Sequence, residues 1–151
     1  YHRERILKPK WDQPMTPHFR LDNNVIIFSL FPGIREDLIR HIIHTPNLKA
    51  IVMRTFGSGN APQSPWLLKA LKEGTKNGKV IVNISQCLQG AVEMSRYDCG
   101  YHLQEAGVIS GYDQTVESAV TKLMFLQSHY PDDPDTIRRL MAQSLRGEIT
   151  R

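Results

Sequence analysis

The chain has 151 residues, of which 40% are apolar and 23% charged, and its formal net charge is +4. This length suits one domain with its own core, and the composition is that of an ordinary globular protein. No apolar stretch of about 18 residues and no signal-peptide pattern appears, so we expect a soluble protein without a membrane partner.

Basic residues gather in the first 20 positions, which fits either a nucleic-acid or lipid-binding tail or a solvated linker. No aromatic stacking platform accompanies them, so we favour the linker and expect no nucleic-acid partner. The two cysteines, Cys87 and Cys99, are not spaced as a redox or metal motif. They indicate a reduced, cytoplasmic protein, and nothing predicts a cofactor or a metal.

Residues 1–22 contain Pro9, Pro14 and Pro17 and show no hydrophobic period, which predicts an interdomain linker before a domain over 23–151. Apolar, β-branched runs in the domain predict strands. Capping residues and 3.6-residue patterns predict helices between them. The predicted elements are strand 25–30, helix 34–44, strand 49–54, helix 65–77, strand 79–85, a weak helix 98–105, strand 106–111, helix 115–129 and helix 134–147.

The patterns also predict which side chains face the core. In helix 34–44 these are Ile34, Leu38 and Ile42, with Ile39 as a further candidate, and in helix 115–129 they include Val116, Ala119 and Leu123. The alternation of strand and helix predicts an α/β fold. We expect a three-layer, Rossmann-like domain with a parallel sheet of about four strands flanked by helices.

A glycine-rich loop, Gly57-Ser58-Gly59-Asn60, follows the second strand. Glycines free the backbone to present N–H groups, and the Asn60 amide both donates and accepts hydrogen bonds, which suits an amino-acid ligand. The third glycine of a dinucleotide fingerprint and the Gly-Lys-Ser/Thr of a P-loop are missing. Glycines here can equally serve the turn alone.

Arg54, at the end of the same strand, must face solvent, a partner or an anionic ligand such as a carboxylate. A plain surface salt bridge is the alternative.

Other candidates for chemistry are weaker. His41 and His44 are three residues apart on a helix but lack a third ligand, so a solvated helix face is favoured. Cys87 follows a strand and is either a nucleophile without an assignable base or a small, partly buried thiol. No serine lies in a G-x-S-x-G elbow, and no pair of carboxylates has a reason to converge. The chain composes no nucleophile–base–oxyanion set.

Several ordered motifs resemble the C-terminal domain of cytoplasmic, type I bacterial L-asparaginases. They are Arg54 to Pro62, Val82-Asn83 with Gln86-Cys87, Gly107-Val108-Ile109 with Asp113, Thr115-Val116-Glu117, Thr121-Lys122-Leu123 and Ser144 to Glu148. The resemblance covers about residues 24 to 150. It implies a parent enzyme that hydrolyses L-asparagine to L-aspartate and ammonia, with the catalytic threonines in an N-terminal domain that is absent here. The isolated domain is expected to be inactive.

The resemblance also implies site residues and partners. Gly59 and Asn60 would form part of the substrate wall of an active site shared between subunits. Pro62 stands where secreted relatives place a substrate-contacting asparagine. Those relatives also supply a glutamate from the loop that matches about residues 90 to 100, and the resemblance does not align Glu93 with it. Arg54, Ser85 and Cys87 would bind asparagine at an allosteric site. Partners would be the N-terminal domain and further copies in a dimer or tetramer. Related amidases that act on glutamine or on the amide of Glu-tRNA are close alternatives. The rival interpretation is a stand-alone α/β module that binds a small metabolite or nucleotide, and a third is an assembly domain without a ligand.

Overall fold

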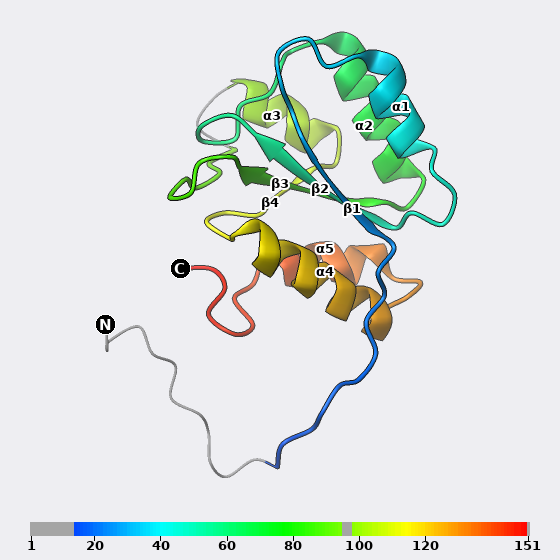
Figure 1. The fold of residues 1–151 in the computed structure, drawn as a ribbon, viewed down its shortest axis with the longest axis vertical. Coiled ribbons are helices and arrows are strands. Elements are labelled where there is room, and N and C mark those ends of the chain that lie inside the picture. Colours follow the sequence, from blue (N-terminus) through cyan, green and yellow to red (C-terminus); the bar gives the residue numbers. More distant parts are fainter. Residues whose placement is uncertain (1–13, 95–97, 151) are drawn as a thin grey trace.

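The computed structural model describes residues 14–94 and 98–150, apart from the side chains of 98 and 99. Its centre is a four-stranded, fully parallel sheet with the order β1-β2-β3-β4 (Figure 1). The strands are β1 (Val25–Ser29), β2 (Ala50–Thr55), β3 (Val80–Ser85) and the short β4 (Ile109–Ser110). The predicted three-layer α/β fold is confirmed.

Five helices connect and cover the sheet within the described residues. These are α1 (Glu36–Ile43), α2 (Pro65–Lys76), α3 (Asp98–Glu105), α4 (Val116–His129) and α5 (Pro134–Met141). Figure 1 shows α1, α2 and α3 on one side of the sheet and α4 and α5 on the other.

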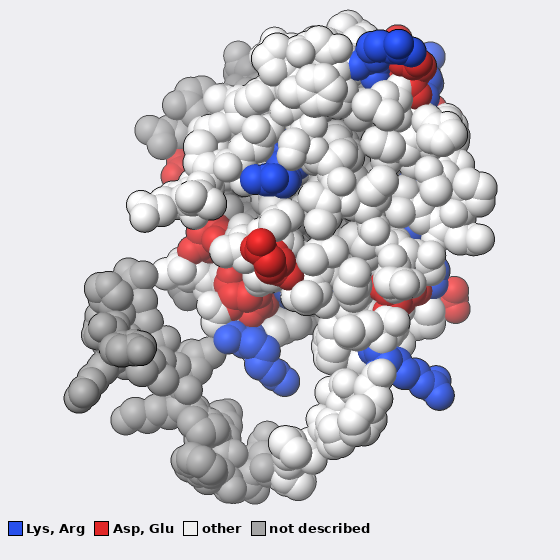
Figure 2. All heavy atoms as spheres, viewed as in Figure 1, with Lys and Arg blue, Asp and Glu red and all other residues white. Residues whose placement is uncertain are grey.

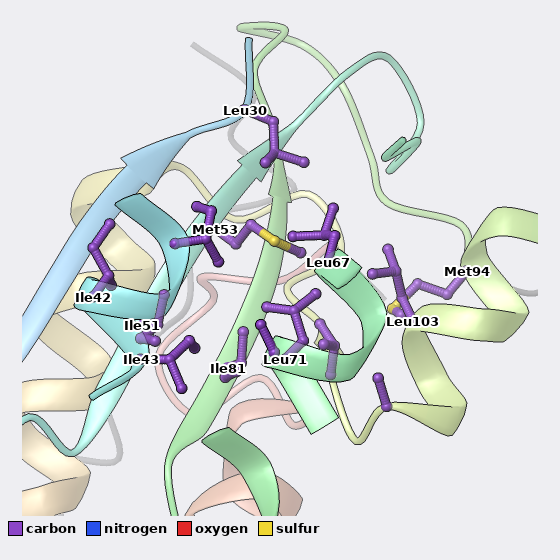
Figure 3. Packing of buried hydrophobic residues seen from close by; sticks show 14 of the residues in the cluster. Leu30, Ile42, Ile43, Ile51, Met53, Leu67, Leu71, Ile81, Met94 and Leu103 are labelled. Atoms are coloured by element: carbon purple, nitrogen blue, oxygen red, sulfur yellow. The ribbon is translucent and has the colours of Figure 1, made fainter. Parts of the chain in front are cut away.

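Side chains that alternate along the strands form one core on each face of the sheet. Ile51, Met53 and Ile81 point toward α1 and α2, where they pack against Ile43, Leu67 and Leu71 of the first core cluster (Figure 3). The alternate residues of the same strands, among them Val52 and Ile84, point toward α4 and α5. Both faces are therefore buried, which explains why these strands read as continuous apolar runs.

Local signals set the starts of the helices. Ser64 precedes α2 with Pro65 at its first position, the Thr115 hydroxyl accepts the N–H of Ser118 before α4, and Asp133 accepts the N–H of Thr136 before α5. The starts at Ser64-Pro65 and Asp133-Pro134 agree with the sequence predictions, although the Ser64 side chain makes no capping hydrogen bond.

Three details of the predicted helices are wrong. Leu38 is 46% exposed, whereas α1 buries the predicted Ile42, the candidate Ile39 and also Ile43. The last helix ends at Met141 rather than near 147. Helix α4 buries Leu126 and two polar residues, Lys122 and Gln127, that its pattern did not mark as core positions.

The end of the predicted linker lies beside α4 (Figure 1). The Asp22 N–H donates to the carbonyl of Met124, and the Ser128 hydroxyl donates to that of Arg20. The rest of the linker, residues 1–13 with most of the basic tail, lies outside the described residues. In the described part of the chain, no helix is both long and apolar enough to cross a membrane.

Candidate functional site

Because the strands are parallel, their carboxyl ends lie along one edge of the sheet, where ligands bind in open α/β folds. Two loops at this edge follow β2 and β3, whose last residues, Thr55 and Ser85, are register partners. The N–H of Gln86 donates to the Thr55 carbonyl at 2.8 Å. The glycine loop and the Cys87 loop are therefore neighbours.

The 57–60 loop is a tight turn. Phe56 and Asn60 pair as an antiparallel bridge, with N–H···O distances of 2.9 and 2.8 Å. Gly59 is buried and has φ +108°, a conformation that other L-residues rarely adopt. A Cβ on it would lie 2.7 Å from Cγ1 of Val92. Glycine is therefore needed at position 59 for two reasons: the turn requires a positive φ, and the loop lies too close to Val92 for a side chain.

A buried polar pair lies directly under this loop. Thr55 and Asn83 are both 0% exposed, and the Thr55 hydroxyl donates to Oδ1 of Asn83 at 2.6 Å. Nδ2 of Asn83 donates to the carbonyl of Gly59 at 3.2 Å. Sequence reasoning did not assign a role to either residue. The sequence did offer one signal: Asn83 is a polar residue within the otherwise apolar run of β3. A polar side chain buried there needs a hydrogen-bond partner, which could have pointed to the loop above it.

Arg54 is half-buried at the end of β2. Its Nε is buried without a hydrogen-bond partner, and among the described residues its guanidinium has no ion pair. The salt-bridge interpretation therefore lacks a partner in this part of the chain. Arg54 is the register partner of Ile84, so its side chain starts from the α4 face of the sheet. This unpaired cation suits a ligand carboxylate.

Ser85 and Cys87 have different settings. The Ser85 hydroxyl donates to the Gly57 carbonyl at 2.6 Å and accepts the N–H of Cys87 at 3.0 Å. It therefore holds the two loops together, starting from the sheet face opposite Arg54. Cys87 is an exposed free cysteine. Both lie at the same edge as Arg54.

A hollow of about 440 Å³ adjoins the glycine loop on the β4 side. The loop after β3 supplies Glu93 to its lining, and the turn after β4 supplies Tyr112 and Asp113. The N–H of Glu93 donates to the carbonyl of Ser58 at 3.0 Å, so Glu93 lies next to the glycine loop. The hollow brings together two carboxylates, Glu93 and Asp113, that no sequence pattern had paired.

His41 in α1 and His44 just after it form no metal centre with other described residues. Nε2 of His44 lies 3.5 Å from Oε1 of Glu73, and His41 lines a separate hollow beside Leu38. No group of three or more His, Cys, Asp or Glu side chains in 14–94 and 98–150 is placed to hold an ion. On the face in Figure 2, positive and negative side chains are scattered in small mixed groups rather than gathered into a basic patch.

Comparisons with known proteins agree with this architecture. Residues 24–141 match the family model for the glutaminase/asparaginase C-terminal domain. L-asparaginase 1 of Escherichia coli K12 is 42% identical over 137 residues, which are 91% of this chain and 38% of that protein. The human 60 kDa lysophospholipase is 40% identical over 149 residues, which are 99% of this chain and 26% of that protein.

The crystal structure of L-asparaginase I from Vibrio cholerae superposes with a TM-score of 0.80 at 41% identity, covering 91% of this chain and 40% of that one. The chain thus spans about two fifths or less of the length of these relatives. The family model covers all four strands and all five helices of the described residues, and the fold agrees. The chain belongs to the glutaminase/asparaginase C-terminal domain family.

Proposed function

We propose that this chain is the C-terminal domain, 23–151, of a cytoplasmic type I L-asparaginase, joined through the linker 1–22 to an N-terminal catalytic domain. The observation that carries the proposal is the 42% identity to an L-asparaginase 1 over 91% of this chain. At the carboxyl edge of the sheet, the Ser85 hydroxyl is bonded to main-chain groups of Gly57 and Cys87 rather than to a base, which agrees with chemistry carried by another domain.

In the parent enzyme, a threonine hydroxyl of the N-terminal domain attacks the side-chain amide carbon of L-asparagine. The C–N bond breaks, and the amide nitrogen takes up a proton and leaves as ammonia. Water then hydrolyses the acyl-enzyme ester, which releases L-aspartate and restores the threonine. This domain contributes the subunit interface of a dimer or tetramer and one wall of the substrate site.

Gly59 and Asn60 are the residues we assign to that wall. They lie at the carboxyl edge of the sheet, in a turn closed by the bridge between Phe56 and Asn60. The Asn60 amide offers both a donor and an acceptor, which match the amide and amino groups of asparagine. Glu93, which lies beside the loop, is a further member of this wall.

We assign a second, effector site for L-asparagine to Arg54, Ser85 and Cys87. The support is the guanidinium of Arg54, which has a buried Nε and no ion pair among the described residues. Because Arg54 and Ser85 start from opposite faces of the sheet, a shared ligand would lie around its carboxyl edge. Since the Ser85 hydroxyl is already used between the loops, Arg54 is the main expected contact.

The test is hydrolysis by the longer protein that contains this chain. Ammonia release would be measured with L-asparagine and L-glutamine, and fatty-acid release with a lysophospholipid, because one relative is named a lysophospholipase. We expect turnover of L-asparagine. Turnover of glutamine alone would correct the substrate, and a protein that hydrolyses only the lysophospholipid, or nothing, would overturn the proposal.

A thermal-shift panel addresses the rival binding module. If this chain alone were stabilised by a nucleotide and not by L-asparagine or L-aspartate, the module interpretation would stand instead. A ligand at a hundredfold excess over its Kd stabilises a protein by about 2.7 kcal/mol, which such a scan resolves.

A further inference from the structure

Every carbonyl of the 57–60 loop is held by a donor from the domain. That of Gly57 accepts the Ser85 hydroxyl, and that of Ser58 accepts the N–H of Glu93. That of Gly59 accepts Nδ2 of Asn83, and that of Asn60 accepts the N–H of Phe56. The N–H groups of Gly59 and Asn60 both donate to the Phe56 carbonyl, at 3.1 and 2.8 Å. Within the described residues, the N–H groups of Gly57 and Ser58 donate to no protein acceptor.

Of these four anchors, only Asn83 is a fully buried side chain. Its Oδ1 receives the Thr55 hydroxyl, which fixes the amide so that Nδ2 points at the Gly59 carbonyl. The main chain of Asn83 is fixed as well, because its carbonyl accepts the N–H of Gly111 at 2.7 Å. The loop, β2 and the turn after β4 therefore meet at this one residue.

The fit around Gly59 is close on both sides. A Cβ there would lie 3.3 Å from Nδ2 of Asn83 as well as 2.7 Å from Val92. The loop is packed so closely against Asn83 and Val92 that a shift of the Asn83 side chain is expected to move it. No free space between these groups could absorb such a shift.

We infer that Asn83, fixed by Thr55, is the positioning residue of the substrate loop: through its bond to the Gly59 carbonyl it sets where Gly59 and Asn60 meet the substrate. This inference rests on the proposed function, since it assumes that the loop forms the substrate wall. Asn83 touches no substrate and takes no part in bond making.

The test compares threonine variants of the full-length enzyme. Thr55→Val removes the hydroxyl at nearly constant volume and leaves the Asn83 amide free to turn, whereas Thr55→Ser keeps the donor. Thr75→Val is the matched control: the Thr75 hydroxyl donates to the Ala106 carbonyl at 2.6 Å, remote from the loop. Asn83→Asp, which cannot donate to Gly59, is a second, harsher variant.

Two readouts separate positioning from general stability. Amide hydrogen exchange in the 57–60 loop is expected to be faster in Thr55→Val than in wild type, and unchanged in Thr55→Ser and Thr75→Val. KM for L-asparagine is expected to rise about fivefold in Thr55→Val with kcat changed less than about twofold, as for loss of one neutral hydrogen bond in binding.

Loop exchange that is the same in Thr55→Val and Thr75→Val would overturn the inference. Faster loop exchange with an unchanged KM would also overturn it, because the loop would then not bear on the substrate. If exchange rises but the wild-type enzyme hydrolyses no amide, the proposed function fails while the structural role of Asn83 stands. The two failures are thus distinguishable.

Discussion

Glu148 is held in its charged form by the chain around it. Oε1 lies 2.6 Å from Nζ of Lys122, and the N–H groups of Leu145 and Arg146 donate to the same carboxylate. Burial alone would raise the pKa of Glu148. The bonds from Leu145, Lys122 and Arg146 outweigh it and lower the pKa from 4.5 to about 2.

This lowered pKa predicts a pH dependence of stability. The stabilisation is present in full above pH 4.5, the unfolded value, and is lost as the pH falls toward 2. Chemical denaturation of wild type between pH 6 and pH 2.5 should therefore show a loss on the order of 3 kcal/mol from this group. In Glu148→Gln, the free energy of unfolding should fall much less over the same pH range, because glutamine does not titrate.

Asp135→Asn is the matched control, because that carboxylate is 89% exposed. It should reproduce the wild-type pH profile. If Glu148→Gln also followed the wild-type profile, the lowered pKa of Glu148 would be wrong.

Arg54 is the residue on which the effector proposal depends. In the full-length enzyme, we expect initial rates against L-asparagine concentration to be sigmoidal for wild type and hyperbolic or weak for Arg54→Ala. The reason is the loss of the guanidinium that would grip the effector carboxylate. Arg139→Ala, an exposed position on α5, should keep the sigmoidal curve. A curve unchanged by Arg54→Ala would return Arg54 to a surface role.

Between elements, Arg138 ties α5 to the turn that joins α2 and β3. Nη2 of its guanidinium donates to the carbonyls of Thr75 and Lys79, both at 3.1 Å. The side chain is 22% exposed, so the two carbonyls are partly shielded from water. Helix α5 is thus fixed by a side chain bonded to main chain far away in the sequence.

Replacing this tie should lower stability. We expect Arg138→Met to reduce the free energy of unfolding by about 1–3 kcal/mol, the range for bonds to a charged donor whose acceptors stay partly buried. Arg139→Met, one residue along and exposed, should cost less than about 0.5 kcal/mol. Urea denaturation compares the two variants, and equal losses would contradict the assigned role of Arg138.

Elements whose boundaries depend on local chemistry were predictable. Ser64 before α2, Pro65 at its first position and the hydroxyl cap of α4 act within a few residues of sequence. The end of α5 was not. Nζ of Lys122 donates to the carbonyls of Met141 and Gln143, so a side chain from α4 binds the carbonyls where α5 stops. The hydrophobic pattern of residues 134–147 carries no information about this contact with Lys122, so it could not predict where α5 ends.

At the scale of the whole molecule, the active site is expected to need a second domain. We predict that this chain alone, shown to be folded by circular dichroism, releases no ammonia from L-asparagine under conditions in which the full-length enzyme does. The physical reason is that the hydroxyl at the candidate site, that of Ser85, is bonded to main-chain groups rather than to a base that could activate it. Turnover by a clean preparation of the chain would contradict this prediction.

The sequence by itself determined the α/β class, the parallel sheet and the placing of Gly59, Asn60, Arg54 and Cys87 at strand ends, because these follow from hydrophobic period and local turn chemistry. The tertiary structure decided the rest. It placed Asn83 and Thr55 beneath the loop, brought Glu93 beside Ser58, and left Arg54 without an ion pair among the described residues. Such contacts join strands far apart in the chain, and only packing of the sheet fixes which side chains meet.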